Sequence, residues 1–180
     1  MNTQSKVWAT GLMLFSFAVA LLGVACSDSG SSDSDAGTDA SSDASTSTQL
    51  DPQDSESIKS FLVDESYSDF ICEPAPREAR VGSAHGRARV CINSILRDSL
   101  QAANDTHPEG SIAIKELYSN TDELEGHAMV IKTSAGDSDD SWTWYEALAP
   151  DYSNPSYGVG LSSCAICHSG ATDHIFFELP

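Results

Sequence analysis

A cysteine pair followed at once by a histidine stands close to the C-terminus of the 180-residue chain, at Cys164-Ala-Ile-Cys167-His168. Two thiols at this spacing can form thioether bonds with the two vinyl groups of one haem, and the adjacent histidine then binds the iron as its proximal ligand. We therefore expect one haem c per chain, attached through Cys164 and Cys167 and ligated by His168.

Zinc binding and dithiol redox exchange also use close cysteine pairs, and each predicts features that the sequence does not offer. A zinc site would need a second close pair of Cys or His ligands, and no such pair occurs. A thioredoxin-like site would need a strand that runs into a helix, whereas the Pro-, Gly- and Ser-rich residues 150–163 predict a loop before Cys164. Haem attachment is therefore the preferred interpretation.

The second axial position of the haem iron would decide what the haem does. A strong sixth ligand is typical of an electron carrier, whereas an open position is typical of a gas-binding protein or an enzyme. A methionine inside a predicted strand is usually a core residue, and histidines often have surface or hydrogen-bonding roles. His85 and His127 stay open as ligands. The side chains considered for this position are Met129, His85, His107, His127 and His174.

The first 25 residues have the pattern of an export signal. A single positive charge within residues 1–6 precedes an apolar run at 12–22, and small residues then lead to Cys26. We expect a lipoprotein-type signal peptide over residues 1–25 and a lipid on Cys26, with ordinary cleavage before Cys26 as the alternative. The chain is then expected on the periplasmic side of a bacterial membrane, held there only by its lipid anchor.

The next segment, residues 26–51, is expected to be a disordered tether, because Ser, Asp, Ala, Thr and Gly dominate it and it holds no aromatic or basic residue. Residues 52–180 are long enough for one domain with a single core. The formal net charge of -18 argues against a nucleic-acid partner, since a phosphate backbone requires a basic surface. It also suits a small neutral ligand better than an anionic one.

Two of the five cysteines are left after the lipid and the haem are assigned. Cys72 and Cys91 would share an oxidising compartment, which predicts a disulfide bond between them. Two buried free thiols are the alternative.

The hydropathy pattern of residues 52–180 predicts an α+β domain, a mainly antiparallel β-sheet with flanking helices. Helical spacing of apolar residues predicts helices at 54–70 and 94–103. Asp54 can cap the N-terminus of the first helix. Residues 107–110 predict a turn. Trp142 and Trp144 share one strand face, with Tyr145 opposite. Alternation predicts strands at 88–93, 111–118, 127–133 and 141–147.

Several segments together resemble the cytochrome P-460 family, which includes the cytochromes c-prime-beta. They are Pro108-x-Gly110-x(4)-Lys115-Glu116, residues 128–132, Trp142-x-Trp144-Tyr145, and the haem motif followed by Asp173-x-x-Phe176. The resemblance spans most of residues 84–177. It implies a homodimer with a five-coordinate haem against the sheet.

The resemblance also implies a covalent bond between the haem edge and the lysine at the position of Lys115. Lys115 shares a predicted strand face with Ala113 and Leu117, which indicates that this face is at least half buried.

Family members with this cross-link oxidise hydroxylamine, by way of nitric oxide, and place a carboxylate above the iron to accept protons. In this chain Ala128 stands where that carboxylate is expected, with Glu116 and Glu125 nearby in sequence. The c-prime-beta members instead bind nitric oxide or carbon monoxide in an apolar pocket.

The resemblance further implies an arginine at the haem, for which Arg87 and Arg89 are the candidates, facing an anionic ligand or a propionate. His85 stands close to the position where some family members have a distal phenylalanine, so the pocket is expected to be more polar than in those members.

Three functions stay open on these grounds. The first is oxidation of hydroxylamine or nitric oxide, with electrons passed to a periplasmic acceptor. The second is binding of nitric oxide or carbon monoxide without turnover. The third is electron transfer by a six-coordinate haem, with Met129 or His85 on the iron.

Overall fold

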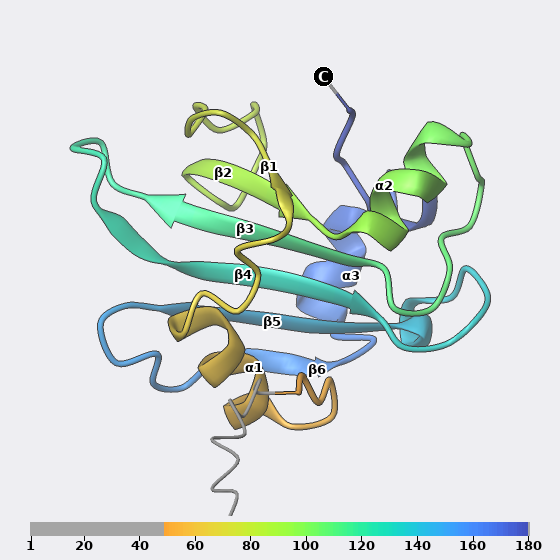
Figure 1. Ribbon diagram of the computed structural model, residues 1–180, viewed down its shortest axis with the longest axis horizontal. Coiled ribbons are helices and arrows are strands. Elements are labelled where there is room, and N and C mark those ends of the chain that lie inside the picture. Colours follow the sequence, from red (N-terminus) through yellow and green to blue (C-terminus); the bar gives the residue numbers. More distant parts are fainter. Residues whose placement is uncertain (1–48, 180) are drawn as a thin grey trace, which may run out of the picture. The chain divides into compact units, whose positions relative to one another are not determined.

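The computed structural model describes residues 49–179, and its strands form one six-stranded antiparallel sheet with helices on both faces (Figure 1). The predicted α+β class is therefore confirmed. Each strand pairs with the next one along the chain, in the order β1-β2-β3-β4-β5-β6. The expected signal segment over residues 1–25, the lipid site Cys26 and nearly all of the expected tether over residues 26–51 lie outside the described residues.

The strands are β1 (Ile71–Cys72), β2 (Arg87–Ile92), β3 (Ile112–Tyr118), β4 (Leu124–Lys132), β5 (Trp142–Leu148) and β6 (Ser156–Val159). The α-helices are α1 (Ser55–Val63), α2 (Ser94–Gln101) and α3 (Ser162–His168), and two short 3-10 turns are η1 (Asp139–Ser141) and η2 (Thr172–His174). None of the helices within residues 49–179 has the length and apolar character to cross a bilayer.

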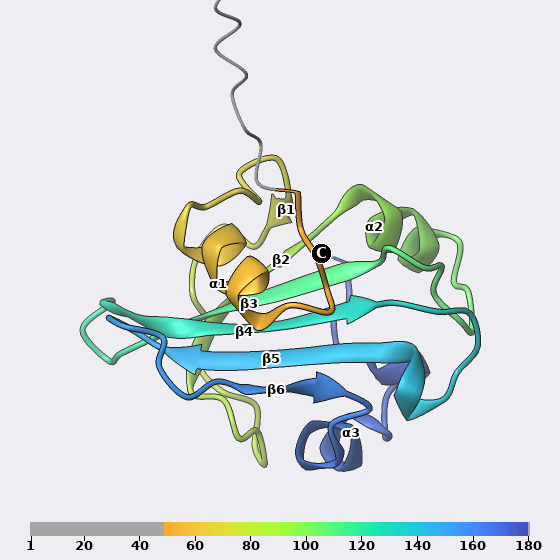
Figure 2. The ribbon, with the colours of Figure 1, turned by 90° about the horizontal axis from the view of Figure 1, so that it is seen from below.

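Each face of the sheet buries its own set of side chains. On one face, Phe61 and Leu62 of α1 pack against β-strand residues such as Ile114. On the other face, Leu96 of α2 packs with Trp144 and with the C-terminal segment. Figure 2 shows α1 and α3 on opposite faces of the sheet. Because successive side chains of a strand point to opposite faces, neighbouring residues of β2 to β5 are divided between these two environments.

The helix α1 begins as predicted and ends earlier. The Asp54 side chain caps it by accepting a hydrogen bond from the Glu56 N–H at 3.0 Å. The helix stops at Val63, not near residue 70, and Glu65 then adopts a left-handed φ of 51°. This turn allows Tyr67 to fold back into the core beside α1.

The prediction of a loop over residues 150–163 is wrong in its second half. β6 occupies Ser156–Val159 and pairs with β5, and α3 begins at Ser162. The strand was missed because it is short, lies at the sheet edge and has no buried residue to produce an alternating pattern. β1 was missed for the same reason, being only two residues long.

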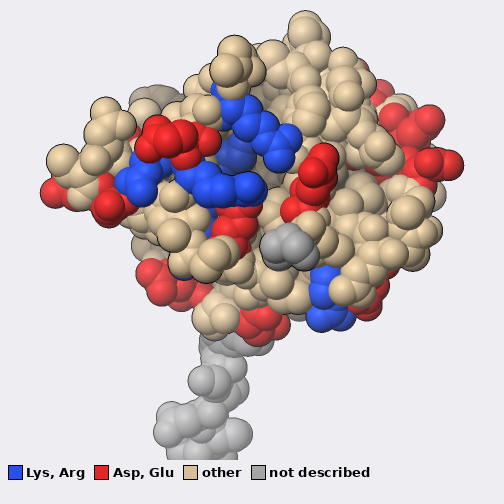
Figure 3. Space-filling model, turned by 90° about the horizontal axis from the view of Figure 1, so that it is seen from above, with Lys and Arg blue, Asp and Glu red and all other residues tan. Residues whose placement is uncertain are grey.

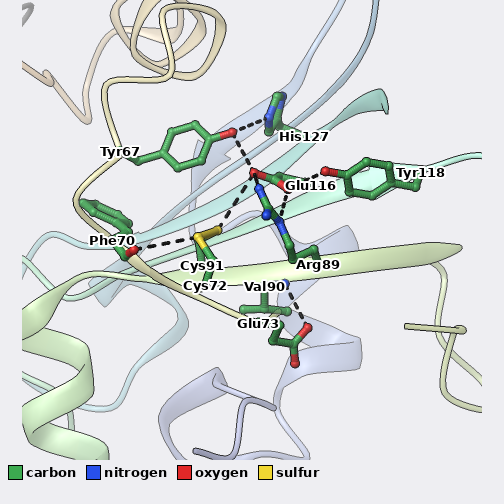
Figure 4. The surroundings of a disulfide bond; sticks show 10 residues. All are labelled: Tyr67, Phe70, Cys72, Glu73, Arg89, Val90, Cys91, Glu116, Tyr118 and His127. Carbon is green, nitrogen blue, oxygen red and sulfur yellow. Dashed lines mark hydrogen bonds and ion pairs between the residues drawn. A yellow bond between two sulfur atoms is a disulfide. The ribbon is translucent and has the colours of Figure 1, made fainter. Parts of the chain in front are cut away.

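The disulfide between Cys72 and Cys91 joins β1 to β2 (Figure 4). The predicted pairing is thus present, and the alternative of two free thiols is wrong. The two cysteines are 19 residues apart in sequence, so the bond closes a loop that contributes about 3 kcal/mol in the chain-entropy model. This loop carries the residues that precede β2.

A buried carboxylate lies close to this disulfide, on the α1 face (Figure 4). Glu116 is 3% exposed and accepts two hydrogen bonds from the Arg89 guanidinium, at 2.6 and 2.7 Å. Tyr118 and Tyr67 donate two more, at 2.7 and 3.1 Å. Burial alone would raise the pKa of Glu116, but these hydrogen bonds outweigh it and lower the pKa below its ordinary value of 4.5. Glu116 is therefore a charged structural residue.

Replacing Arg89 with alanine should destabilise the protein by about 3 kcal/mol, because Glu116 would stay buried without its cation. The free energy of unfolding can be measured by denaturant titration. Arg97→Ala is the matched control, since among residues 49–179 Arg97 pairs only with its exposed neighbour Asp98, and its effect should stay within about 0.5 kcal/mol.

The carboxylate of Glu116 also makes the free energy of unfolding depend on pH in the acidic range. Because the pKa of Glu116 is lower in the folded protein than in the unfolded chain, its contribution to the free energy of unfolding is complete above pH 4.5 and declines as the pH falls toward the folded pKa.

Equal loss of stability in Arg89→Ala and Arg97→Ala would contradict the structural role of the pair of Arg89 and Glu116.

Candidate functional site

A cavity of about 450 Å³ lies on the sheet face opposite α1. Its walls come from α3, from the segment before β2 and from the C-terminal segment. Figure 3 shows Lys and Arg side chains gathered beside a hollow on one face of the molecule. Cofactor and ligand cavities commonly measure roughly 300–1,000 Å³, so the volume is suitable for either. Most of the strand residues that line it are small or apolar, among them Ala88, Val90, Ala113, Ala128 and Val130.

The short helix α3 carries the whole Cys-x-x-Cys-His motif. Cys167 and His168 follow Cys164 by three and four residues, so both lie on the same side of the helix as Cys164. All three residues border the cavity. Both cysteines are free thiols, with Cys164 half-buried and Cys167 exposed. Two reactive sulfur atoms and one imidazole are therefore presented together to a single space.

His168 is held in a defined orientation by its Nδ1 atom. Nδ1 lies 2.7 Å from the backbone carbonyl oxygen of His174, and because a carbonyl can only accept, Nδ1 must carry the proton. Nε2 is then left as the unprotonated nitrogen, as a metal ligand must be. Burial lowers the pKa of His168, which keeps the ring neutral. The rings of Trp144 and Phe176 lie 4.8 and 5.5 Å from it, centroid to centroid.

Lys115 borders the same cavity, as the strand alternation predicted. Its side chain makes no hydrogen bond or ion pair with any residue in the described part of the chain. Burial lowers the pKa of Lys115, although the charge of Glu146 opposes this effect. A larger share of the side chain is therefore the neutral, nucleophilic amine than at an exposed lysine.

Glu146 of β5 brings a carboxylate into the cavity, on a strand where none was expected. Lys115 in β3 is paired with Ala128 in β4, and Ala128 is paired with Glu146 in β5. All three border the cavity. Glu146 thus lies one strand further along the same row as Ala128, the position at which the carboxylate was expected. The alternation that places Trp142 and Trp144 on one face also places Glu146 there, so the signal was present in the sequence.

His85 faces this carboxylate. Its Nδ1 atom lies 3.5 Å from Glu146 Oε1, and this interaction lowers the pKa of Glu146. The His85 ring also lies 6.4 Å from the His168 ring, centroid to centroid. The cavity therefore contains polar groups beside its apolar floor.

The two glutamates that are close to Lys115 in sequence do not reach the cavity. Glu116 belongs to the network on the α1 face, and Glu125 is exposed. Neither can serve as the carboxylate of this site.

Arg87 and Arg89 are not among the cavity residues, which corrects the expectation that they lie at the haem. Arg89 pairs with Glu116 on the other face of the sheet, and Arg87 pairs with Asp122 and Glu78. The physical reason is again alternation, because Ala88 and Val90 take the positions that face the cavity. The arginines that border the cavity are Arg77 and Arg80, from the segment before β2.

The remaining candidate axial ligands make other contacts, although Met129 and His174 also border the cavity. Met129 packs in the α1-side core and is 3% exposed. His127 is hydrogen-bonded on the α1 face between Tyr67 and Tyr152, at 3.0 and 2.7 Å. His107 is buried beside Ser99, 2.9 Å from its hydroxyl. His174 borders the cavity next to His168, which it contacts through its carbonyl group.

The geometry of the cavity disfavours both zinc binding and dithiol redox exchange. Within residues 49–179 no three His, Cys, Asp or Glu side chains are arranged to hold a metal ion, whereas haem iron needs only one or two protein ligands. β6 does run into α3, contrary to the sequence expectation, as a thioredoxin-like site would require. However, β6 is an antiparallel edge strand, and burial raises the pKa of Cys164, which disfavours the thiolate.

The residues of the cavity fit haem c on their own chemistry. Two free thiols and an imidazole with an unprotonated Nε2 are the donors that a c-type haem takes. In addition, the buried Trp144 Nε1 has no hydrogen-bond partner among the described residues, although Trp144 borders the cavity. An unpaired buried donor is expected where a bound group supplies the missing acceptor.

No protein-family model, no curated protein and no solved structure matches this chain.

Haem attachment has a direct chemical test. When the chain is produced with a c-type maturation system, the band from denaturing electrophoresis should give a haem-peroxidase stain. Cys164→Ala combined with Cys167→Ala should abolish the stain, because both thioether bonds are lost.

The double variant Cys72→Ala, Cys91→Ala is the matched control. It removes the same number of cysteines, here the disulfide-bonded pair, from the other face of the sheet and should keep the stain. A wild-type band without stain would contradict haem attachment.

Proposed function

We propose that this chain is a mono-haem c-type cytochrome of the P-460 type, which oxidises hydroxylamine or nitric oxide on the periplasmic side of a bacterial membrane. The lipid anchor at Cys26 and the homodimer belong to the same proposal. The observation that carries it is the position of Lys115, a partly buried lysine without a polar partner among the described residues, in one cavity with Cys164, Cys167 and His168.

Lys115 would form a covalent bond to the haem. Its lowered pKa favours the neutral amine, which is the form that can attack a carbon at the haem edge. Replacing a C–H bond and an N–H bond with one N–C bond releases two protons and two electrons. Maturation would therefore need a two-electron oxidant of the peroxide class.

Glu146 is the proposed proton acceptor. Oxidation of hydroxylamine to nitric oxide releases three protons and three electrons, so a base must be close to the substrate. The interaction with His85 lowers the pKa of Glu146, so its carboxylate is ionised and able to take a proton. A haem iron held by His168 would be the redox centre, from which electrons pass to a periplasmic acceptor.

Lys115→Ala should separate the two leading functions. If the amine is joined to the haem, the ferrous wild-type protein has a strongly red-shifted Soret band, and the variant should show the band of an ordinary high-spin haem c. Hydroxylamine oxidation should fall by at least about 100-fold, while nitric oxide binding persists. Absorption spectra and steady-state assays measure these effects.

Two further variants make this test specific. Lys59→Ala removes a lysine on α1, on the other face of the sheet, and should change neither property. Glu146→Gln should keep the red-shifted band and lower turnover roughly 100- to 10,000-fold, as loss of a positioned base does. A peptide map in which only Cys164 and Cys167 hold the haem would exclude the cross-link and leave gas binding as the function.

A second candidate function is supported by the position of His85. Two imidazoles on opposite sides of one metal ion have ring centroids on the order of 6 Å apart, since each metal–nitrogen bond is about 2 Å long. The rings of His85 and His168 are 6.4 Å apart. His85 on the iron would make a six-coordinate haem, which is typical of electron transfer.

The ferric spectrum decides between these coordination states. Under the P-460 proposal the wild-type haem is high-spin, and His85→Ala leaves it so. If His85 binds the iron, the wild-type haem is low-spin and His85→Ala converts it to high-spin. His107→Ala, which removes a histidine that does not border the cavity, should have no effect on the spin state in either case.

A further inference from the structure

The chain turns sharply after α3, next to His168. Asp173 and His174 have φ values of 41° and 67°, a left-handed conformation that residues other than glycine rarely adopt. Two such residues in succession persist only where the surrounding contacts hold them. The contacts of this turn are therefore informative about what it does.

The carboxylate of Asp173 is the main anchor of the turn. Both of its oxygen atoms lie 2.8 Å from Lys132 Nζ, and both side chains are completely buried. Trp142 Nε1 donates to Oδ1 at 3.1 Å, and the His107 N–H donates to Oδ2 at 2.7 Å. Burial alone would raise the pKa of Asp173, but the hydrogen bonds from Lys132, His107 and Trp142 outweigh it and lower the pKa. β4, β5 and the segment before β3 thus all hold one side chain.

The residue next to this anchor makes the contact that orients His168. The His174 carbonyl oxygen accepts the hydrogen bond from His168 Nδ1 at 2.7 Å. The direction of that carbonyl depends on the left-handed backbone at Asp173 and His174. A continuous chain of contacts therefore runs from Lys132 through Asp173 to the imidazole.

A buried ion pair is seldom the most stable way to fill a core, because the desolvation of both charges offsets their attraction. Its value lies in the specific geometry that it imposes. Here the ion pair fixes the backbone whose carbonyl group orients His168, the ring that would bind the iron.

We infer that Asp173, held by Lys132, is the positioning residue for His168, because it fixes the turn whose carbonyl sets the orientation and the tautomer of the imidazole. The inference rests on the proposed role of His168 as a haem ligand. It does not depend on the cross-link at Lys115 or on hydroxylamine as the substrate.

The test uses the haem-containing protein with the paired variant Lys132→Met, Asp173→Leu. This pair removes both charges together and puts a side chain at position 173 that disfavours a left-handed backbone. The iron–histidine stretching band of the ferrous protein, measured by resonance Raman spectroscopy, should move to lower frequency and broaden, because a less firmly held Nδ1–H makes the imidazole a weaker donor. The reduction potential should rise for the same reason, and turnover should fall roughly 10- to 100-fold.

Lys132→Met, Asp173→Asn is the conservative counterpart. Asparagine tolerates the left-handed conformation, and its single amide oxygen can accept one of the two hydrogen bonds, from Trp142 or from the His107 N–H, so this variant should recover part of the wild-type band position. Arg89→Ala breaks a buried ion pair on the opposite face and should lower stability without moving the band.

An unchanged band and potential in the Leu-containing pair would overturn the inference, as would an equal change in Arg89→Ala. If the Leu-containing pair does not fold, Trp142→Phe decides, because it removes one hydrogen bond to Asp173 and should produce a smaller shift in the same direction. Failure of the hydroxylamine assay alone would leave these spectroscopic outcomes unaffected, so the two proposals can fail separately.

Discussion

Side-chain alternation along β3 separates the chemistry of this protein from its core. Lys115 and Glu116 are neighbours in sequence, yet they lie on opposite faces of the sheet, one at the cavity and the other in a buried ion pair with Arg89. A slip of β3 by one residue against β4 would exchange them. It would put an unpaired lysine into the α1-side core and remove the amine from the cavity. Burial of Ile114 and Met129 on the α1 side holds the register that prevents this.

Much of this arrangement could be predicted from the sequence, because it follows from local patterns. The strands at β2 to β5, the Asp54 cap and the face shared by Trp142 and Trp144 each have a short-range signal, and the disulfide follows from the number of cysteines. The Lys115 side chain lies at the cavity because alternation and its neighbours indicated a half-buried face. These features need no knowledge of which strands pair.

The features that could not be predicted depend on pairing between strands. Alternation along β5 gives the face of Glu146, but its position in one row with Lys115 and Ala128 depends on the strand order β3-β4-β5, which a single strand does not reveal. Arg89 does not line the cavity, because it pairs with Glu116, 27 residues away in sequence, on the other face of the sheet. Arg77 and Arg80 come from a segment without regular structure, so no periodicity marks them. Of the nine Lys and Arg residues in the chain, Lys115, Arg77 and Arg80 border the cavity, together with the carboxylates of Glu73, Glu78 and Glu146.

The sheet order also bears on how the cysteines find their partners. Because each strand pairs with the next along the chain, Cys72 and Cys91 face each other on the paired strands β1 and β2, whereas Cys164 and Cys167 belong to α3. The entropy lost on closing a loop grows with the length of the loop, so Cys72–Cys91 pairing is favoured over any pairing with the distant thiols. If the chain enters an oxidising compartment from its N-terminus, the first pair can oxidise before the second pair emerges. Such an order of appearance would protect the two C-terminal thiols from mispairing.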